Sequence, residues 1–191
     1  GLSKMGLIPI VHTITPFLIE RSFEQIKLDF GYQKLPVNLV SVGGSFDYSK
    51  LGCSHHSYSD LAIINQFENS QFFYPGSAVE FDVLFNQTYK KNKINYFRVS
   101  DFSHNIKFKE NQIKFGKGIK LNQGKDLTII CAASFLDDAI STSNILKTKK
   151  IETEIIYLHT LKPIDKKMIL KSVKKTKKVL ILDNFNLNGG L

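Results

Sequence analysis

The sequence predicts an α/β protein built from two doubly wound domains with mainly parallel sheets. Short apolar runs alternate with segments of helical periodicity along nearly the whole chain. This alternation is typical of parallel sheets whose two faces are covered by helices. One polar stretch, rich in lysine and asparagine, interrupts the pattern at residues 102–111. We therefore place one domain at residues 1–106 and the other at residues 113–191.

The first half contains four predicted strands, which are apolar runs of the kind that is buried in a parallel sheet. They lie at residues 7–14, 36–43, 70–76 and 94–100. Three helices are predicted between them, at residues 16–32, 58–67 and 77–91. In the third helix Ser77 stands at the first position, where its hydroxyl can accept a hydrogen bond from a free backbone N–H.

The second half repeats the alternation on a smaller scale. Its predicted strands lie at residues 127–133, 153–160 and 178–184. One helix is predicted at residues 135–148, and another follows Pro163, since proline is tolerated in the first turn of a helix. Strands that alternate with helices in this way predict a small doubly wound domain.

The composition is that of a globular protein, because 42% of its 191 residues are hydrophobic and 23% are charged. No apolar run approaches the roughly 20 residues that span a bilayer, and no secretory signal opens the chain. Cys53 and Cys131 lie far apart without metal or redox spacing, which favours two reduced thiols. We therefore expect a cytoplasmic protein with no membrane partner.

The net charge of +9 comes almost entirely from lysine. The lysines gather at residues 90–93, 147–150 and 171–178, where they are typical of the solvated face of an amphipathic helix. No aromatic platform or nucleic-acid motif is interleaved with them, so we expect no nucleic-acid partner. A positive field of this kind would help to attract phosphorylated sugars.

Few side chains indicate a reaction when they are considered alone. His55 and His56 lie in a predicted loop, and one of them could act as an acid or base near neutral pH. Arg98 ends a predicted strand, at the edge where parallel sheets place ligand contacts. Its guanidinium could grip a phosphate, or it could pair with a carboxylate such as Asp60 or Asp101.

The sequence also has histidines in predicted strands, and it lacks several common catalytic motifs. We interpret His12 and His159, which lie in or at the end of predicted strands, as core histidines with satisfied hydrogen bonds. The sequence has no HExxH, P-loop, GxSxG or GxGxxG pattern. Interpretations as a metalloprotease, a nucleotide-phosphate enzyme or an acyl transferase therefore lack support.

Several segments of the chain together resemble the transketolase family. In the first half, "GLIPIVHT", "RSFEQIK", "LGCSHHSYSDLA" and "YFRVS" are similar to the family's pyrimidine-binding domain. In the second half, "FGKGIKLNQGKDLTII" and "LHTLKPIDKKMILKSVKKTKKVLILDN" are similar to its carboxy-terminal domain. Each segment alone is moderately specific, whereas their order and spacing together are much more so. The resemblance thus assigns residues 1–106 to the first domain and residues 113–191 to the second.

The resemblance implies a transferase that moves a two-carbon ketol unit between sugar phosphates with thiamine diphosphate as its cofactor. Phe17 is the best match to the aromatic residue that packs on the aminopyrimidine ring, and Phe23 is the second candidate. His55 corresponds to a histidine of the substrate channel and is the implied catalytic residue. Arg98 corresponds to an arginine that contacts substrate phosphate.

The resemblance also implies parts that residues 1–191 do not include. The family's catalytic glutamate belongs just upstream of the segment that begins at Gly1, so the chain resembles an N-terminally truncated member. The diphosphate and Mg²⁺ are implied to bind a separate domain, so no metal ligand is expected in this chain. We expect a partner in the form of a diphosphate-binding domain or subunit, in a homodimer or heterotetramer. We expect no transketolase activity from the isolated chain.

Departures from the family pattern leave the substrate open. Leu51 or Lys50 stands where many transketolases have an acidic residue, and a histidine at one strand end is lost in "LDNF" at residues 182–185. One alternative is a 1-deoxyxylulose-5-phosphate synthase or the β subunit of a 2-oxo acid dehydrogenase. Another alternative is a non-catalytic protein that supports dimerisation.

Overall fold

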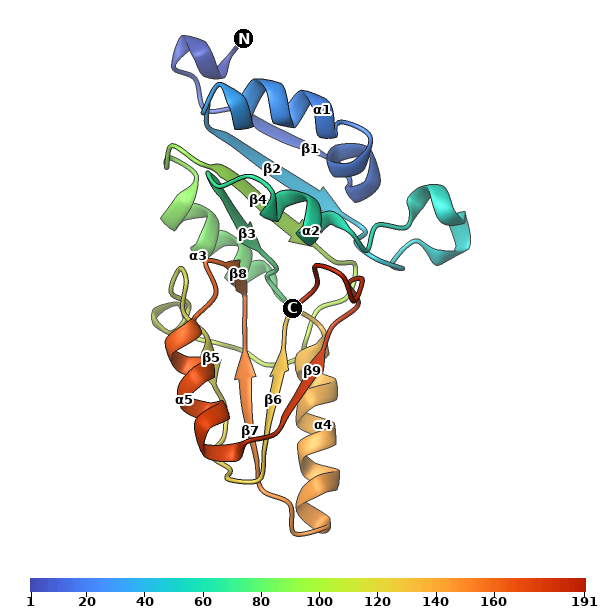
Figure 1. Ribbon diagram of the computed structural model, residues 1–191, viewed down its shortest axis with the longest axis vertical. Coiled ribbons are helices and arrows are strands. Elements are labelled where there is room, and N and C mark those ends of the chain that lie inside the picture. The colour runs from blue at the N-terminus through green and yellow to red at the C-terminus, as the bar shows by residue number, and fades with distance from the viewer.

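The computed structural model describes residues 1–191 as two α/β halves, one above the other in Figure 1. The upper half contains a sheet in the order β1-β2-β4-β3-β8. Its strands are β1 (Ile10–Ile14), β2 (Val37–Val42), β3 (Ser70–Phe73), β4 (Ile94–Val99) and β8 (Thr160–Lys162). All neighbouring pairs are parallel except β3 and β8, which are antiparallel. The prediction of a mainly parallel sheet is confirmed.

Helices cover both faces of this upper sheet, as the alternation of strands and helices predicts. One face is covered by residues 16–32 and by α2 (Asp60–Asn65), and the other by α3 (Ala78–Thr88). Successive strand residues point to opposite faces. Phe72 accordingly packs edge-on against Tyr96 on the first face, while Phe73 stacks on Phe97 on the second.

The predicted helix at residues 16–32 forms, but most of it is wound more widely than an α-helix. Two π-helical stretches, η2 (Pro16–Glu20) and η3 (Ile26–Tyr32), flank the short α1 (Phe23–Gln25). The Ser22 hydroxyl donates a hydrogen bond back to the Leu18 carbonyl, a contact that competes with the regular helical pattern. α3 is regular, and its predicted N-cap is confirmed because the Ser77 hydroxyl accepts a hydrogen bond from Glu80 N–H.

β1 is less buried than the sequence predicts. It pairs with β2 alone and lies at the edge of the sheet, so Ile10 and Val11 expose 57% and 39% of their surface. The interpretation of His12 as a core histidine is wrong for the same reason, since this residue is exposed. Its Nδ1 nevertheless lies 2.8 Å from the Val40 carbonyl oxygen.

His159 is a core residue, as the sequence predicts, but its hydrogen bonding is incomplete. The side chain is fully buried, and its Nδ1 lies 3.1 Å from the Thr160 hydroxyl. Its Nε2 has no hydrogen-bond partner. The expectation of burial is therefore confirmed, whereas the expectation of satisfied hydrogen bonds is wrong for one of the two ring nitrogens.

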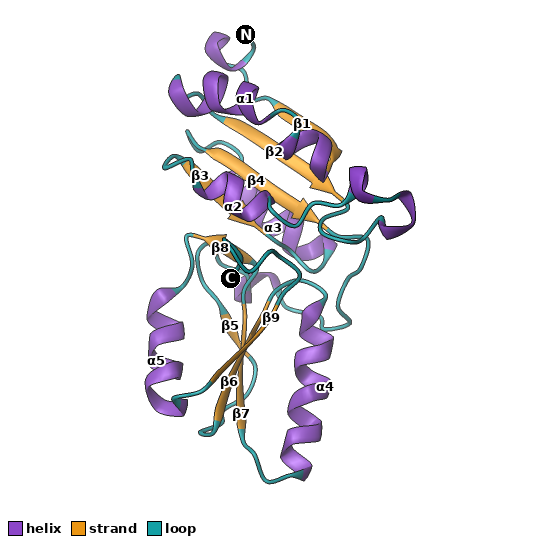
Figure 2. Cartoon of the chain, turned by 45° about the vertical axis from the view of Figure 1, so that its right-hand side comes forward, coloured by secondary structure: helices purple, strands orange, loops and turns teal.

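The lower half contains a second sheet in the order β5-β7-β6-β9. Its strands are β5 (Ile119–Lys120), β6 (Leu127–Cys131), β7 (Thr153–Tyr157) and β9 (Val179–Leu182). Only the short β5 is antiparallel to its neighbour. α4 (Phe135–Thr148) and α5 (Lys166–Thr176) lie on opposite sides of this sheet (Figure 2). The second doubly wound domain is therefore present.

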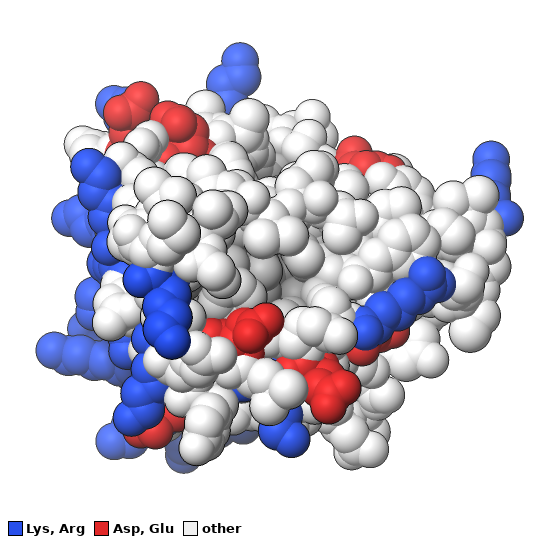
Figure 3. All heavy atoms as spheres, turned by 90° about the horizontal axis from the view of Figure 1, so that it is seen from above, with Lys and Arg blue, Asp and Glu red and all other residues white.

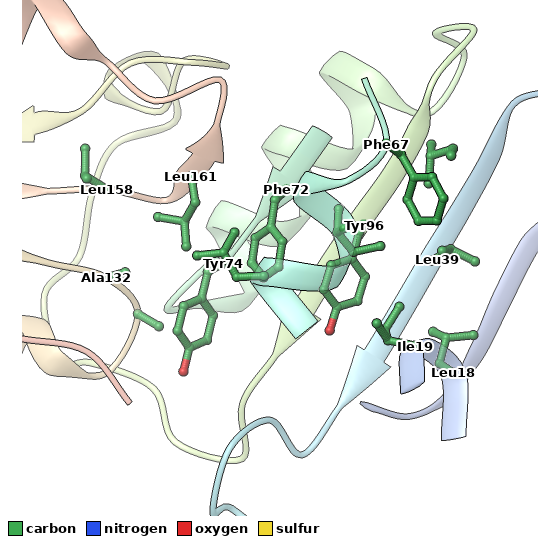
Figure 4. Packing of buried hydrophobic residues seen from close by; sticks show 14 of the residues in the cluster. Leu18, Ile19, Leu39, Phe67, Phe72, Tyr74, Tyr96, Ala132, Leu158 and Leu161 are labelled. Atoms are coloured by element: carbon green, nitrogen blue, oxygen red, sulfur yellow. The ribbon is translucent and has the colours of Figure 1, made fainter. Parts of the chain in front are cut away.

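The two halves share one hydrophobic core. β8 comes from the second half of the sequence yet completes the upper sheet, and Tyr74 N–H donates a hydrogen bond to the His159 carbonyl. Figure 4 shows Leu161 of β8 beside Phe72, and Leu158 and Ala132 of the lower half belong to the same hydrophobic cluster. The two halves of the fold are thus packed firmly together. The predicted ends of the two domains, at residues 106 and 113, stay a prediction.

A buried polar cluster also joins the halves. Glu80 Oε1 lies 2.7 Å from His104 Nε2, and the Tyr157 hydroxyl donates a 2.6 Å hydrogen bond to Glu80 Oε2. The Gly76 N–H donates to the same oxygen at 2.9 Å. Burial acts to raise the pKa of Glu80, but the hydrogen bonds from His104 and Tyr157 hold it below its ordinary value. The polar stretch at residues 102–111 is therefore anchored, because His104 is buried.

Candidate functional site

The candidate site lies where the parallel strands β1, β2 and β4 end, at the carboxyl edge of the upper sheet. Two segments meet there: the first turn of the helical region at residues 16–21 and the loop at residues 43–59. Loops at this edge commonly carry the ligand contacts of open α/β sheets. These two segments carry Phe17 and His55, two of the predicted site residues.

Phe17 and His55 are brought together, although they are far apart in the sequence. Their ring centroids lie 5.2 Å apart, with the planes inclined by 62°. His55 belongs to the short turn η5 (Cys53–His55), and its Nδ1 lies 3.0 Å from the Ser54 hydroxyl. Both rings are partly exposed, so they form an aromatic surface that a ligand can reach.

Arg21 and Glu20 belong to the same surface, and the sequence interpretation missed both. The Arg21 guanidinium lies over the Phe17 ring, 4.1 Å from its centroid, and Nη2 donates a 3.2 Å hydrogen bond to the Ser54 carbonyl. Glu20 Oε1 accepts a 2.8 Å hydrogen bond from the Ser57 hydroxyl, and partial burial raises the pKa of its carboxyl. The spacing of four residues between Phe17 and Arg21 was a usable signal, since such residues are neighbours on a helix.

Phe23 is placed away from this surface. Its ring packs against Phe67 with a centroid distance of 5.7 Å. It lines a pocket of about 780 Å³ together with Lys27, Lys34 and Lys93. Lys93 directly precedes β4, so this pocket lies at the amino ends of the strands, opposite the edge that carries Phe17. The structure thus separates the two aromatic residues that were predicted for the cofactor.

Arg98 is enclosed, with 0% of its surface exposed. Its Nη1 donates a 2.9 Å hydrogen bond to Asp60 Oδ1, while Nη2 donates to Ser45 Oγ at 2.5 Å and to Asn184 Oδ1 at 3.2 Å. The Phe185 ring covers the guanidinium at 4.3 Å. Of the two interpretations of Arg98, pairing with Asp60 is the one that the structure contains. A substrate phosphate could reach this side chain only if Asn184 and Phe185 moved away.

A chain of hydrogen bonds links this enclosed centre to the helical turn of Phe17. Tyr96 OH donates a 2.7 Å bond to Asp60 Oδ2 and lies 2.8 Å from Ser41 Oγ. The Thr15 hydroxyl donates to Ser41 Oγ at 2.9 Å. Burial raises the pKa of Asp60, and the adjacent Arg98 and Tyr96 oppose that rise. Thr15 lies two residues before Phe17, so the buried network fixes the start of the turn that presents the aromatic surface.

The residues of the site fit one end of the cofactor that the resemblance implies. Phe17 offers a partly exposed aromatic ring on which an aminopyrimidine could stack, and His55 offers a ring nitrogen near the same place. No three His, Cys, Asp or Glu side chains converge as a possible metal-ligand set.

Family models match both halves of the chain. The pyrimidine-binding domain of transketolase matches residues 1–101, and the transketolase C-terminal domain matches residues 116–191. The two matches define the class of protein, which is a chain that carries the pyrimidine-binding and C-terminal domains of a transketolase. The chain belongs to the transketolase family.

Individual relatives agree with this assignment. One of the subunits of apulose-4-phosphate transketolase from Phocaeicola vulgatus is 28% identical over 193 residues, which cover 100% of this chain and 62% of the relative. The 1-deoxy-D-xylulose-5-phosphate synthase of Halothermothrix orenii is 26% identical and is covered over 30% of its length. A solved split-gene transketolase, described as an inactive β4 tetramer, superposes with a TM-score of 0.88 at 26% identity over 99% of this chain and 61% of its own. The chain therefore spans less than two thirds of these relatives.

The surface of the molecule is uneven in charge. In the view of Figure 3, Lys and Arg side chains gather along the left-hand edge, whereas the middle of that face carries few charges.

No helix of the structure has the length and apolar character needed to cross a bilayer.

Proposed function

We propose that this chain forms the pyrimidine-binding and carboxy-terminal part of a thiamine-diphosphate-dependent transketolase. The enzyme would transfer a two-carbon ketol unit between sugar phosphates in the cytoplasm. The observation that carries the proposal is the convergence of Phe17 and His55 on one accessible surface, in a chain whose two halves match the two transketolase domains.

Each residue of the surface has a proposed task. Phe17 stacks against the aminopyrimidine and so holds the cofactor in position, whereas Phe23 is left as the less favoured candidate because it packs against Phe67. His55 donates a hydrogen bond or a proton to the reacting oxygen of the sugar. The cofactor supplies stabilisation of a carbanion when it is bound. The phosphate contact that the resemblance implies for Arg98 would require the displacement of Asn184 and Phe185.

The proposal requires a partner that binds the diphosphate and Mg²⁺. Such a domain could be another part of a longer chain or a separate protein, in a homodimer or a heterotetramer. The Phocaeicola vulgatus relative is named as one subunit of its enzyme, and the solved β4 tetramer is described as inactive. Both descriptions support a separate partner. A transketolase without that partner would lack the groups that hold the charged end of the cofactor.

A second candidate is supported by a specific observation. The 1-deoxy-D-xylulose-5-phosphate synthase of Halothermothrix orenii aligns with 100% of this chain. That chemistry would use pyruvate as donor instead of a ketose phosphate. A purely supporting protein is a third possibility, which the accessible Phe17–His55 surface disfavours.

Activity measured with the diphosphate-binding partner tests the proposal. We would mix the chain with its partner, thiamine diphosphate and Mg²⁺, and compare turnover of xylulose 5-phosphate plus ribose 5-phosphate with turnover of pyruvate plus glyceraldehyde 3-phosphate. We expect only the first pair to react. His55→Ala should lower kcat by about 100-fold, as for loss of a general acid or base. His56→Ala is the matched control, because the His56 ring contacts Phe46 instead of Phe17.

Other outcomes would change the assignment. Turnover of the pyruvate pair alone would favour the synthase. Equal losses from His55→Ala and His56→Ala would remove His55 from its catalytic role. No turnover of either pair, by a complex that assembles and binds the cofactor, would favour the supporting protein.

A further inference from the structure

We infer that Arg21 is the phosphate-binding group of the Phe17–His55 surface, and that Arg98 is not. The inference rests on the proposed function and deepens it, because it assigns the recognition of a sugar's phosphate monoester to a particular side chain. Arg21 and Arg98 are the two arginines of the chain. One is exposed beside the candidate site, and the other is enclosed.

The charge of Arg98 is already matched. Asp60 lies 2.9 Å away with both side chains fully buried. Two further oxygens, from Ser45 and Asn184, accept hydrogen bonds from Nη2. A phosphate placed at this guanidinium would add a second negative group beside Asp60 in a site without solvent. Such crowding of like charges in a buried site is unfavourable.

The charge of Arg21 is not matched by a carboxylate. No Asp or Glu oxygen lies within 4.0 Å of its guanidinium nitrogens, although such pairs exist elsewhere in the chain. The neighbouring Glu20 is hydrogen-bonded to Ser57 instead. Of the N–H donors of Arg21, one bonds to the Ser54 carbonyl and the rest have no protein acceptor. The side chain is thus an exposed cation with free donors in a fork that suits a phosphate.

The position of Arg21 is fixed relative to the reactive surface. Its guanidinium lies over the Phe17 ring, and its hydrogen bond reaches the residue immediately before His55. A phosphate bound here would therefore place the rest of a small sugar close to the His55 imidazole. The stacked and hydrogen-bonded guanidinium of Arg21 is already held in place, so it loses little conformational freedom when it binds a phosphate. A lysine at this position would have a flexible stem and a single charged nitrogen, and it would not be held in this geometry.

The competing explanation is that Arg21 only ties the loop at residues 53–57 to the helical turn. Its contacts with Phe17 and the Ser54 carbonyl would then be complete by themselves. The two explanations differ in what a phosphate does. A structural tie is indifferent to phosphate, whereas a binding group makes the affinity for a phosphorylated sugar depend on Arg21.

Titration of the 191-residue chain, monitored by NMR at the His55 ring, separates the two explanations. The probes are ribose 5-phosphate and, as its uncharged match, ribose. The variants are Arg21→Gln, Arg21→Lys and Lys27→Gln, the last as a control that removes one exposed positive charge further along the same helical region. We expect Arg21→Gln to weaken ribose 5-phosphate binding by about tenfold or more, as for loss of a charge-assisted hydrogen bond. Arg21→Lys should be intermediate, and Lys27→Gln and all ribose titrations should be unchanged.

A third probe identifies the source of the phosphate. Thiamine diphosphate and thiamine are titrated in the same way, because a cofactor diphosphate offers similar chemistry. A loss in Arg21→Gln that is confined to thiamine diphosphate would overturn the assignment to substrate. So would unchanged ribose 5-phosphate binding in Arg21→Gln, or the absence of any response of His55 to ribose 5-phosphate in the unaltered chain.

Failure of this inference is distinguishable from failure of the proposed function. An active complex in which Arg21→Gln changes neither binding nor KM for ribose 5-phosphate would retain the transketolase assignment and reject the Arg21 site. An inactive complex whose chain loses ribose 5-phosphate affinity in Arg21→Gln would retain the Arg21 site and reject the transketolase assignment.

Discussion

Two arginines stand at the same end of the upper sheet in opposite surroundings. Arg98 is enclosed by Asp60, Ser45 and the residues that follow β9, whereas Arg21 lies exposed over Phe17. A buried charge is tolerated only where partners satisfy it, and removing one partner leaves the other uncompensated. An exposed charge contributes little to stability and keeps its donors available. The enclosed centre has the contacts of a structural element, whereas the open surface is the one that we propose binds the ligand.

The largest expected effect comes from breaking the enclosed centre. Arg98→Met should lower the free energy of unfolding by about 3–5 kcal/mol, because it leaves the Asp60 carboxylate buried without its cation. Urea unfolding measures this loss. Lys125→Met is the control, since it breaks the exposed pair with Glu152 and should cost less than about 1 kcal/mol. A loss below about 1 kcal/mol in Arg98→Met would mean that the enclosed pair is not structural.

A second enclosed group should make stability depend on pH. Burial lowers the pKa of His159 from 6.5 to about 4, although the nearby Glu80 carboxylate acts in the opposite direction. The unfolded chain therefore binds a proton at a higher pH than the folded chain does. Stability should be fully present above pH 6.5 and should fall by about 3 kcal/mol as the pH drops toward 4.

The variant His159→Gln isolates this contribution. It should remove most of the change in unfolding free energy between pH 7 and pH 4.5, whereas His12→Gln, at an exposed histidine, should leave it unchanged. The remaining acid sensitivity should come from carboxylates such as Glu80. Because the pKa of Glu80 is lowered in the folded chain, its contribution to stability is lost only as the pH falls through that lowered pKa. An unchanged pH profile in His159→Gln would show that this imidazole is not held neutral by burial.

The smallest expected effect belongs to the open surface. Arg21→Gln removes the contact with the Phe17 ring and one hydrogen bond, and an exposed contact of this kind is worth about 0.5–1 kcal/mol. Its unfolding free energy should therefore fall by no more than about 1 kcal/mol in urea titrations. A loss as large as that of Arg98→Met would mean that the two arginines do not differ in role.

The sequence predicted the fold better than it predicted the site. Apolar runs and helical periodicity identified nearly every strand and helix, and Ser77 was correctly placed as an N-cap. The pattern could not show that residues 160–162 form β8 and join the upper sheet, because that pairing depends on how the halves pack. It also predicted a buried β1, since an apolar run looks the same at the edge of a sheet and in its middle.

The candidate residues show where a linear pattern stops being informative. Phe17 and Phe23 lie six residues apart in one predicted helix, yet the structure directs them to opposite ends of the strands. Arg98 could pair with a carboxylate or grip a phosphate, and the resemblance favoured the phosphate; its enclosed position beside Asp60 could not be read from the sequence. Arg21 was overlooked because no motif marks an exposed guanidinium, and its significance depends on its contacts with Phe17 and Ser54.

The most direct test of the account is the affinity of the assembled enzyme for thiamine diphosphate in two matched variants. Phe17→Leu should raise the cofactor's dissociation constant by about five- to tenfold, as for loss of one aromatic stacking contact. Phe23→Leu removes a ring of the same size from the same helical region and should leave this constant unchanged, because Phe23 packs against Phe67. A larger loss in Phe23→Leu, or no loss in Phe17→Leu, would contradict the placement of the cofactor at the Phe17–His55 surface.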